Sequence, residues 1–165
     1  MANQLKTSEH RVAVVVAGAG ARGGYEAGVL SVVVPRLREA GVRAPMFIGT
    51  SAGAINATIF AALSHLPPHE QARQAIDVWR GISVSDVFRS PVIGSPAIVL
   101  RFAGQLLRLS GVTLTSLLDT EPLRRKANAV IDWEQLRRNI ADGTTTLAVV
   151  ATSGADNRTA VFVGP

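Results

Sequence analysis

The sequence predicts an α/β domain in which parallel strands alternate with helices. An apolar, β-branched run at residues 11–17 is typical of a strand buried on both faces, and a helical pattern follows it at 25–40. A second short strand at 44–49 and a helix from 52 to about 64 repeat this order. Because crossovers between parallel strands are right-handed, we expect the two strands to be neighbours with their carboxyl ends at one edge.

The later elements are predicted from local signals. Gly41 is placed to end the first helix, and Pro35 should kink that helix or reset its start. Asp132 and Gln135 resemble a capping box at the start of another helix. The remaining expected elements are helices at 69–80, 97–109 and 132–140, a short helix after Thr120, and a hairpin of strands at 145–152 and 159–163.

Composition places the chain among globular proteins and narrows its partners. Of the 165 residues, 47% are hydrophobic and 18% are charged, which suits one domain with a core. The net charge of +5 is compatible with acidic partners. The basic residues are scattered and are not interleaved with aromatic ones, so we expect no nucleic-acid binding. Cysteine is absent and the histidines lack ligand spacing, so we expect no metal, and we expect no cofactor.

The ends and the location of the protein are also predicted. The first ten residues are polar and are expected to form a flexible lead-in to a single domain over 11–165. The apolar run at 12–17 is too short for a signal-peptide core, and no apolar stretch approaches the length of a membrane span. We therefore expect a cytoplasmic protein.

A serine follows the second strand in the pattern Gly-x-Ser-x-Gly. In that setting a serine occupies a sharp strand-to-helix turn with its hydroxyl exposed, and the following helix directs free N–H groups towards it. A side chain in place of either glycine would crowd the strand against the helix. The alternative is an ordinary turn between two apolar segments. We interpret Ser51 as a nucleophile. The residues of the expected elbow around it are Gly49, Thr50, Ala52 and Gly53.

A glycine-rich segment of the form Gly-x-Gly-x-x-Gly follows the first strand. Its residues are Gly18, Ala19, Gly20, Ala21, Arg22 and Gly23. One interpretation is a dinucleotide fingerprint, which requires an acidic residue at the end of the second strand. That strand runs into Gly49 instead, and the nearest acid, Glu39, belongs to the intervening helix. We favour an oxyanion hole, because a glycine-rich loop beside the serine can direct several N–H groups at one spot. Arg22 is either a solvated surface arginine or a functional residue that supports the loop or attracts an anionic headgroup.

Together these two motifs resemble the patatin-like phospholipase family. The likeness rests on residues 17–30 and 49–57, with weaker echoes at 78–80, 86–88 and 118–123. The resemblance implies a three-layer α/β/α fold with a mainly parallel central sheet. It also implies hydrolysis of lipid acyl esters by a serine–aspartate dyad, with Ser51 as the nucleophile and the glycine-rich loop as the oxyanion hole. One departure is Ala19, where the family often has a third successive glycine.

The base of such a dyad is missing from the sequence. The family's aspartate lies in a later Asp-Gly-Gly or Asp-Gly-Ala motif. Asp142 precedes Gly143, but this pair is expected in a turn between a helix and a strand, and Asp156 in the hairpin turn. His65 and His69 are expected on the surface, since no acid separates them from the serine as a hydrolase triad requires. Because serine is a weak nucleophile without a base, we expect a domain incomplete at its C-terminus, and no activity from these residues alone.

The expected partner is a lipid or phospholipid substrate. The predicted helix at 97–109 is apolar over a wide arc, with Arg101 and Arg108 on the opposite side. It either contacts a membrane surface, as a peripheral protein would, or packs into the core. Two other functions stay open: a non-catalytic lipid- or membrane-binding fragment of the same fold, and a dinucleotide-binding α/β domain.

Overall fold

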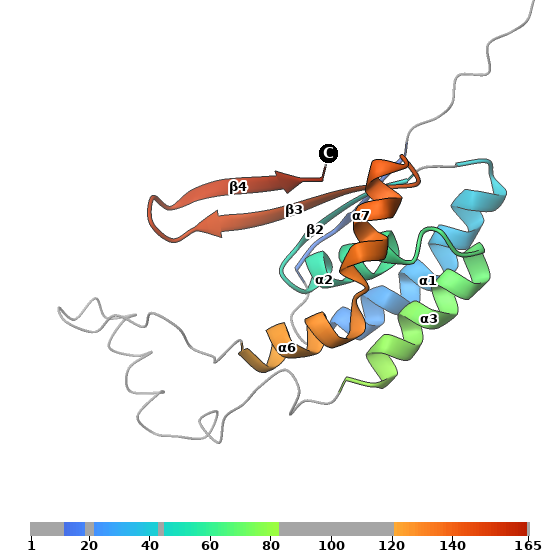
Figure 1. The fold of residues 1–165 in the computed structure, drawn as a ribbon, viewed down its shortest axis with the longest axis horizontal. Coiled ribbons are helices and arrows are strands. Elements are labelled where there is room, and N and C mark those ends of the chain that lie inside the picture. The colour runs from blue at the N-terminus through green and yellow to red at the C-terminus, as the bar shows by residue number, and fades with distance from the viewer. Residues whose placement is uncertain (1–11, 19–21, 43–44, 83–120, 165) are drawn as a thin grey trace, which may run out of the picture. The chain divides into compact units, whose positions relative to one another are not determined.

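The computed structural model describes residues 12–18, 22–42, 45–82 and 121–164. They divide between two compact units, one containing the described residues up to 81 and from 130 onward, and one containing most of helix α6 (Glu121–Val130). The elements of the first unit are β1 (Ala13–Val16), α1 (Gly23–Glu39), β2 (Met46–Thr50), α2 (Ala52–Ala62), α3 (Pro68–Arg80), α7 (Trp133–Ala141), β3 (Thr146–Ser153) and β4 (Arg158–Val163) (Figure 1).

The strands form one mainly parallel sheet in the order β1-β2-β3-β4. β1 pairs with β2, and β2 with β3, in parallel, while β4 returns antiparallel to β3. The predicted neighbouring strands and the predicted hairpin are thus confirmed. Asn157 closes the hairpin turn in the left-handed region, with φ of 53°, which asparagine tolerates better than most residues. The α/β class with a mainly parallel sheet is confirmed.

The described helices of this unit gather on one face of the sheet (Figure 1). The strand order follows the chain order from β1 to β3, so both crossovers advance in one direction, and right-handed connections then lie on the same face. Helix α2 packs on the strands, and α1, α3 and α7 pack on α2. The described helices therefore supply one of the two helical layers of the predicted three-layer arrangement.

The described helices leave parts of the other face of the sheet exposed. Val15 of β1 and Val161 of β4 point to this face and are 71% and 57% exposed. The expectation that the first strand is buried on both faces is therefore wrong. Its continuous apolar run reflects β-branched strand residues, whereas burial depends on which face the crossovers cover.

The core lies between the sheet and α2. Phe47 of β2 and Phe60 of α2 are fully buried, and their ring centroids are 6.1 Å apart. All α2 residues from 56 to 62 are buried. A helix that is buried all round is central to its domain, and the alanines among these residues let neighbouring helices approach closely. Helix α2 is therefore the centre of the packing, and Ser51 directly precedes it.

Several local predictions are resolved by the structure. Helix α1 begins at Gly23 and runs through Pro35 to Glu39, so the proline does not reset its start, and Gly41 follows with φ of 90°. The carboxylate of Asp132 caps α7 by accepting the Gln135 N–H at 2.8 Å. Only this half of the capping box forms, because the Gln135 side-chain oxygen accepts hydrogen bonds from the Arg138 guanidinium instead of from the Asp132 N–H. The predicted lead-in at 1–10 and the predicted helix at 97–109 lie outside the described residues.

Candidate active site

Ser51 occupies a strained turn between β2 and α2. Its φ is 54° and its ψ is −130°, a conformation that non-glycine residues rarely adopt, and the residue is exposed. Such a conformation costs on the order of 1–3 kcal/mol and persists only where the surroundings impose it. The strand–turn–helix geometry predicted around Ser51 is therefore present, with the serine at the carboxyl end of a parallel strand.

Close approach of main chains explains the two glycines of the elbow. A Cβ built on Gly53 would lie 2.3 Å from the Val16 carbonyl oxygen of β1. One built on Gly49 would lie 2.5 Å from the Cα of Ala54. Real Cβ atoms do not approach other atoms this closely, so the first turn of α2 can rest against β1 and β2 only because both positions are glycine.

The glycine-rich segment begins beside the serine. A Cβ on Gly18 would lie 2.9 Å from Ser51 Cβ and 3.5 Å from its Oγ. The first residue of the glycine-rich segment, Gly18, therefore lies beside Ser51. This proximity is expected for loops that follow neighbouring parallel strands. Arg22 is exposed, and Gly23 is the buried first residue of α1. Ala19, Gly20 and Ala21 lie outside the described residues, so their role as oxyanion-hole donors stays a prediction.

The histidines considered for a triad lie on the surface, as predicted. His65 is exposed, and its Nδ1 lies 3.1 Å from the Ala62 carbonyl oxygen of its own helix end. The Nε2 of His69 lies 3.4 Å from Glu39, and both side chains are largely exposed. Neither histidine is paired with Ser51.

The aspartates that the structure describes have local roles. Asp77 pairs with Arg73 and Arg80 along α3, at 3.2 and 3.0 Å. Asp142 follows α7 and precedes Gly143, whose φ is 69°, so this pair forms the predicted turn. Asp156 lies in the turn of the hairpin. None of these contacts places a base at Ser51.

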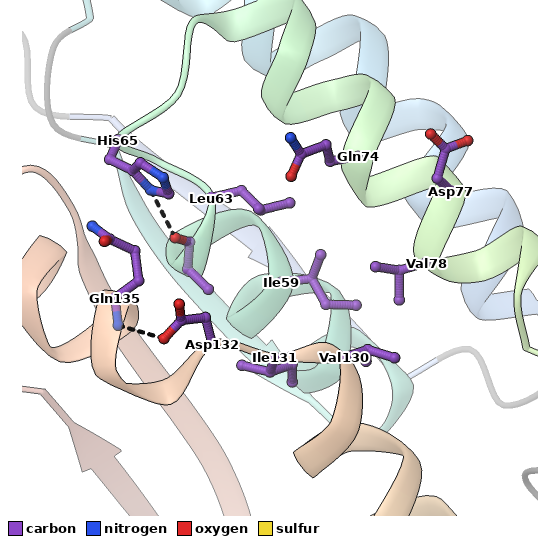
Figure 2. A pocket seen from close by; sticks show the side chains of 11 residues that line it. Ile59, Leu63, His65, Gln74, Asp77, Val78, Val130, Ile131, Asp132 and Gln135 are labelled. Atoms are coloured by element: carbon purple, nitrogen blue, oxygen red, sulfur yellow. Dashed lines mark hydrogen bonds between the residues drawn. The ribbon is translucent and has the colours of Figure 1, made fainter.

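A cavity of about 520 Å³ opens at the other end of α2 (Figure 2). Its floor is apolar, with Ile59 and Val78 pointing towards each other, and its rim is polar. The polar groups of the rim are His65, Gln74, Asp77, Asp132 and Gln135. Each is already bonded within the chain, and Gln74 donates to Glu70 at 2.8 Å. The neighbouring Arg73 guanidinium, bonded to Glu70, lowers the pKa of that carboxyl. Ile59 is the first residue of α2 that lines the cavity, and it lies about 12 Å along the helix from Ser51, at 1.5 Å per residue.

Two further properties bear on the class of protein. Within the described ranges, no cluster of three or more histidine, cysteine, aspartate or glutamate side chains is arranged to hold a metal ion. Within the same ranges, no helix has both the length and the apolar character needed to cross a membrane.

The family model described as patatin-like phospholipase matches residues 14–164. The match covers most of the chain and includes both the elbow and the glycine-rich segment. The chain therefore belongs to the patatin-like phospholipase family, and membership implies lipid hydrolase activity in general. This confirms the resemblance seen in the two motifs. None of the curated proteins or solved structures compared with the chain matches it.

Proposed function

We propose that the protein is a serine hydrolase that cleaves acyl esters of phospholipids or other lipids, with Ser51 as its nucleophile. The observation that carries the proposal is the strained, exposed conformation of Ser51 in the elbow, with Gly18 against its side chain. Strain of this kind costs stability and serves to present a side chain at a functional site. Family membership supplies the lipid substrate class.

In the proposed reaction, Ser51 Oγ attacks the ester carbonyl carbon and transfers its proton to an aspartate. Backbone N–H groups of the loop at 18–23 stabilise the negative oxygen of the tetrahedral intermediate. The ester C–O bond then breaks, the alcohol product takes the proton, and water hydrolyses the acyl-serine. In this proposal the aspartate lies beyond the 165 residues, because the sequence holds no Asp-Gly-Gly or Asp-Gly-Ala motif and the described aspartates have the local roles given above.

The test combines active-site labelling with hydrolysis. A fluorophosphonate probe should label the full-length protein at Ser51, and Ser51→Ala should abolish both labelling and release of fatty acid from phospholipid vesicles. Ser31→Ala is the matched control, because the Ser31 hydroxyl bonds the Gly28 carbonyl oxygen within α1 at 2.7 Å. This control should retain both activities.

Three outcomes would contradict the proposal. Undiminished fatty-acid release by Ser51→Ala would exclude this serine as the nucleophile. Ester hydrolysis by the 165-residue chain that depends on Ser51 would show that the base lies within these residues. Vesicle binding without hydrolysis or labelling would favour the non-catalytic lipid-binding alternative.

A further inference from the structure

We propose that Asn56 and Trp79 are positioning residues that hold the glycine-rich loop at its working distance from Ser51. They act through the main chain of Gly23, where the loop becomes α1. This inference rests on the proposed function of Ser51 and of the loop.

Asn56 joins three helices through one buried amide. It lies in α2 and is 0% exposed. Its Nδ2 donates to the Gly23 carbonyl oxygen at 2.9 Å and to Glu26 Oε2 at 3.2 Å, both in α1. Its Oδ1 accepts the indole N–H of Trp79, in α3, at 2.7 Å. A carbonyl only accepts and an indole N–H only donates, so the amide has one usable orientation.

Trp79 also presses its ring on the main chain of Gly23. A Cβ on Gly23 would lie 2.4 Å from Trp79 Cη2 and 2.9 Å from Cζ2. Only glycine allows the indole to sit this close to the start of α1. The far end of the loop is therefore fixed by a hydrogen bond to its carbonyl and by an aromatic ring against its Cα.

The near end of the loop is held by the same helix. Gly53, in the first turn of α2, lies against the carbonyl oxygens of Val16 and Ala17, which lead into Gly18. A stretch of six residues, from the turn before α2 into its second turn, thus contains Ser51, Gly53 and Asn56. Because α2 is central and buried, it acts as a rigid frame that carries the nucleophile and holds both ends of the loop.

Such a frame should matter for the rate of the chemical step. Misplacement of a catalytic group by about 1 Å can lower a rate by about 10²-fold. A disturbance at Gly23 should therefore lower kcat more than it alters KM, since the loop is proposed to contact the developing oxyanion rather than the acyl chain. A merely structural role would lower Tm and leave the kcat of the folded protein unchanged.

The experiment compares alanine substitutions at two adjacent glycines in the full-length protein. Gly23→Ala places a methyl group in the Trp79 ring. Gly24→Ala is the matched control, because its Cβ would meet Trp79 Cε3 at an ordinary 3.6 Å. We expect Gly23→Ala to lower kcat by about 10- to 100-fold with KM within about twofold, and Gly24→Ala to retain the original kcat.

A compensating substitution separates positioning from misfolding. Trp79→Phe removes the outer ring that Gly23 contacts and the N–H that holds Asn56. It should lower kcat by itself, but by less than Gly23→Ala does, because no methyl group is forced against the ring. In Gly23→Ala/Trp79→Phe the smaller ring makes room for the methyl group, so kcat should rise above that of Gly23→Ala.

These variants distinguish failure of the positioning role from failure of the proposed function. If Ser51→Ala abolishes hydrolysis but Gly23→Ala and Gly24→Ala share the original kcat, the positioning role is wrong and the nucleophile stands. A fall in kcat at Gly23 with no recovery in the double variant would also overturn it. If Ser51→Ala retains full hydrolysis, the proposed function fails and this inference fails with it.

Discussion

The two ends of α2 differ in what they present to a ligand. At its start, Ser51 is held in a strained conformation, and main chains of β1, β2 and α2 touch where only glycine fits. At its end, the chain encloses a cavity of about 520 Å³ whose polar rim groups are bonded to their own neighbours. One end presents a residue in a strained conformation, and the other presents a cavity.

This difference shows which signal marks the candidate site. A cavity of this size is within the range of ligand pockets, so volume alone would direct attention to the end of the helix opposite Ser51. Packing alone does not account for the conformation of Ser51. A turn with ordinary backbone angles would avoid the loss of stability that this conformation carries. The following substitutions test the contrast at each end.

The largest effect is expected at Gly53. Gly53→Ala should destabilise the protein by ~3 kcal/mol or more, because the methyl group meets two carbonyl oxygens of the main chain rather than movable side chains. Hydrolysis should be lost with it. Gly28→Ala is the control, since its Cβ would meet nothing within 4 Å. Thermal unfolding checks both variants, and equal Tm values would show that the close approach is not required.

A smaller effect of opposite sign is expected from relief of strain at Ser51. Ser51→Gly and Ser51→Ala both lack the hydroxyl, but only glycine accepts φ of 54° easily. The glycine variant should therefore be more stable than the alanine variant by about 1 kcal/mol.

The control for this comparison is the same pair of substitutions within a helix. At Ser31 in α1, glycine should be less stable than alanine by about 1 kcal/mol. The free energy of unfolding measured in urea gives the two differences. The same sign at both positions would mean that Ser51 is not strained in solution.

The smallest effect on activity is expected at the cavity end. Asp132→Ala should cost about 1 kcal/mol of stability through loss of the cap on α7. Asp132→Asn should keep most of that stability, because asparagine is an equally good cap. Both variants should retain the original kcat, although Asp132 lines the cavity. A tenfold fall in kcat with KM unchanged would show that the cavity end of α2 takes part in the chemical step. The proposed difference between the two ends of the helix would then be wrong.

Much of the scaffold could be predicted from local sequence. The order of strands and helices, the turn at Ser51 and the cap at Asp132 depend on short-range periodicity and on the conformational limits of glycine, serine and aspartate. Even the crowding at Gly49 and Gly53 could be predicted, because a Gly-x-Ser-x-Gly turn between a strand and a helix demands it. The roles of Asp142 and Asp156 in turns followed from similar signals.

Asn56 could not be singled out in the same way. One signal was available: a buried position in an otherwise apolar helix is an unusual place for an amide, and Asn56 and Trp79 both belong to segments that resemble the family. Sequence alone did not connect them, because 23 residues separate them and the identity of a buried amide's partners depends on which helices pack together.

By itself, the sequence determined the strand–turn–helix elbow, the glycines that permit it and the family to which the chain belongs. These features depend on neighbouring residues and on the backbone angles those residues allow. Only the tertiary structure decided that the described helices share one face of the sheet, that Val15 is exposed on the other, and that Asn56 joins α1 to α3. Those outcomes depend on the direction of the crossovers and on long-range packing, which bring together groups that no local pattern relates.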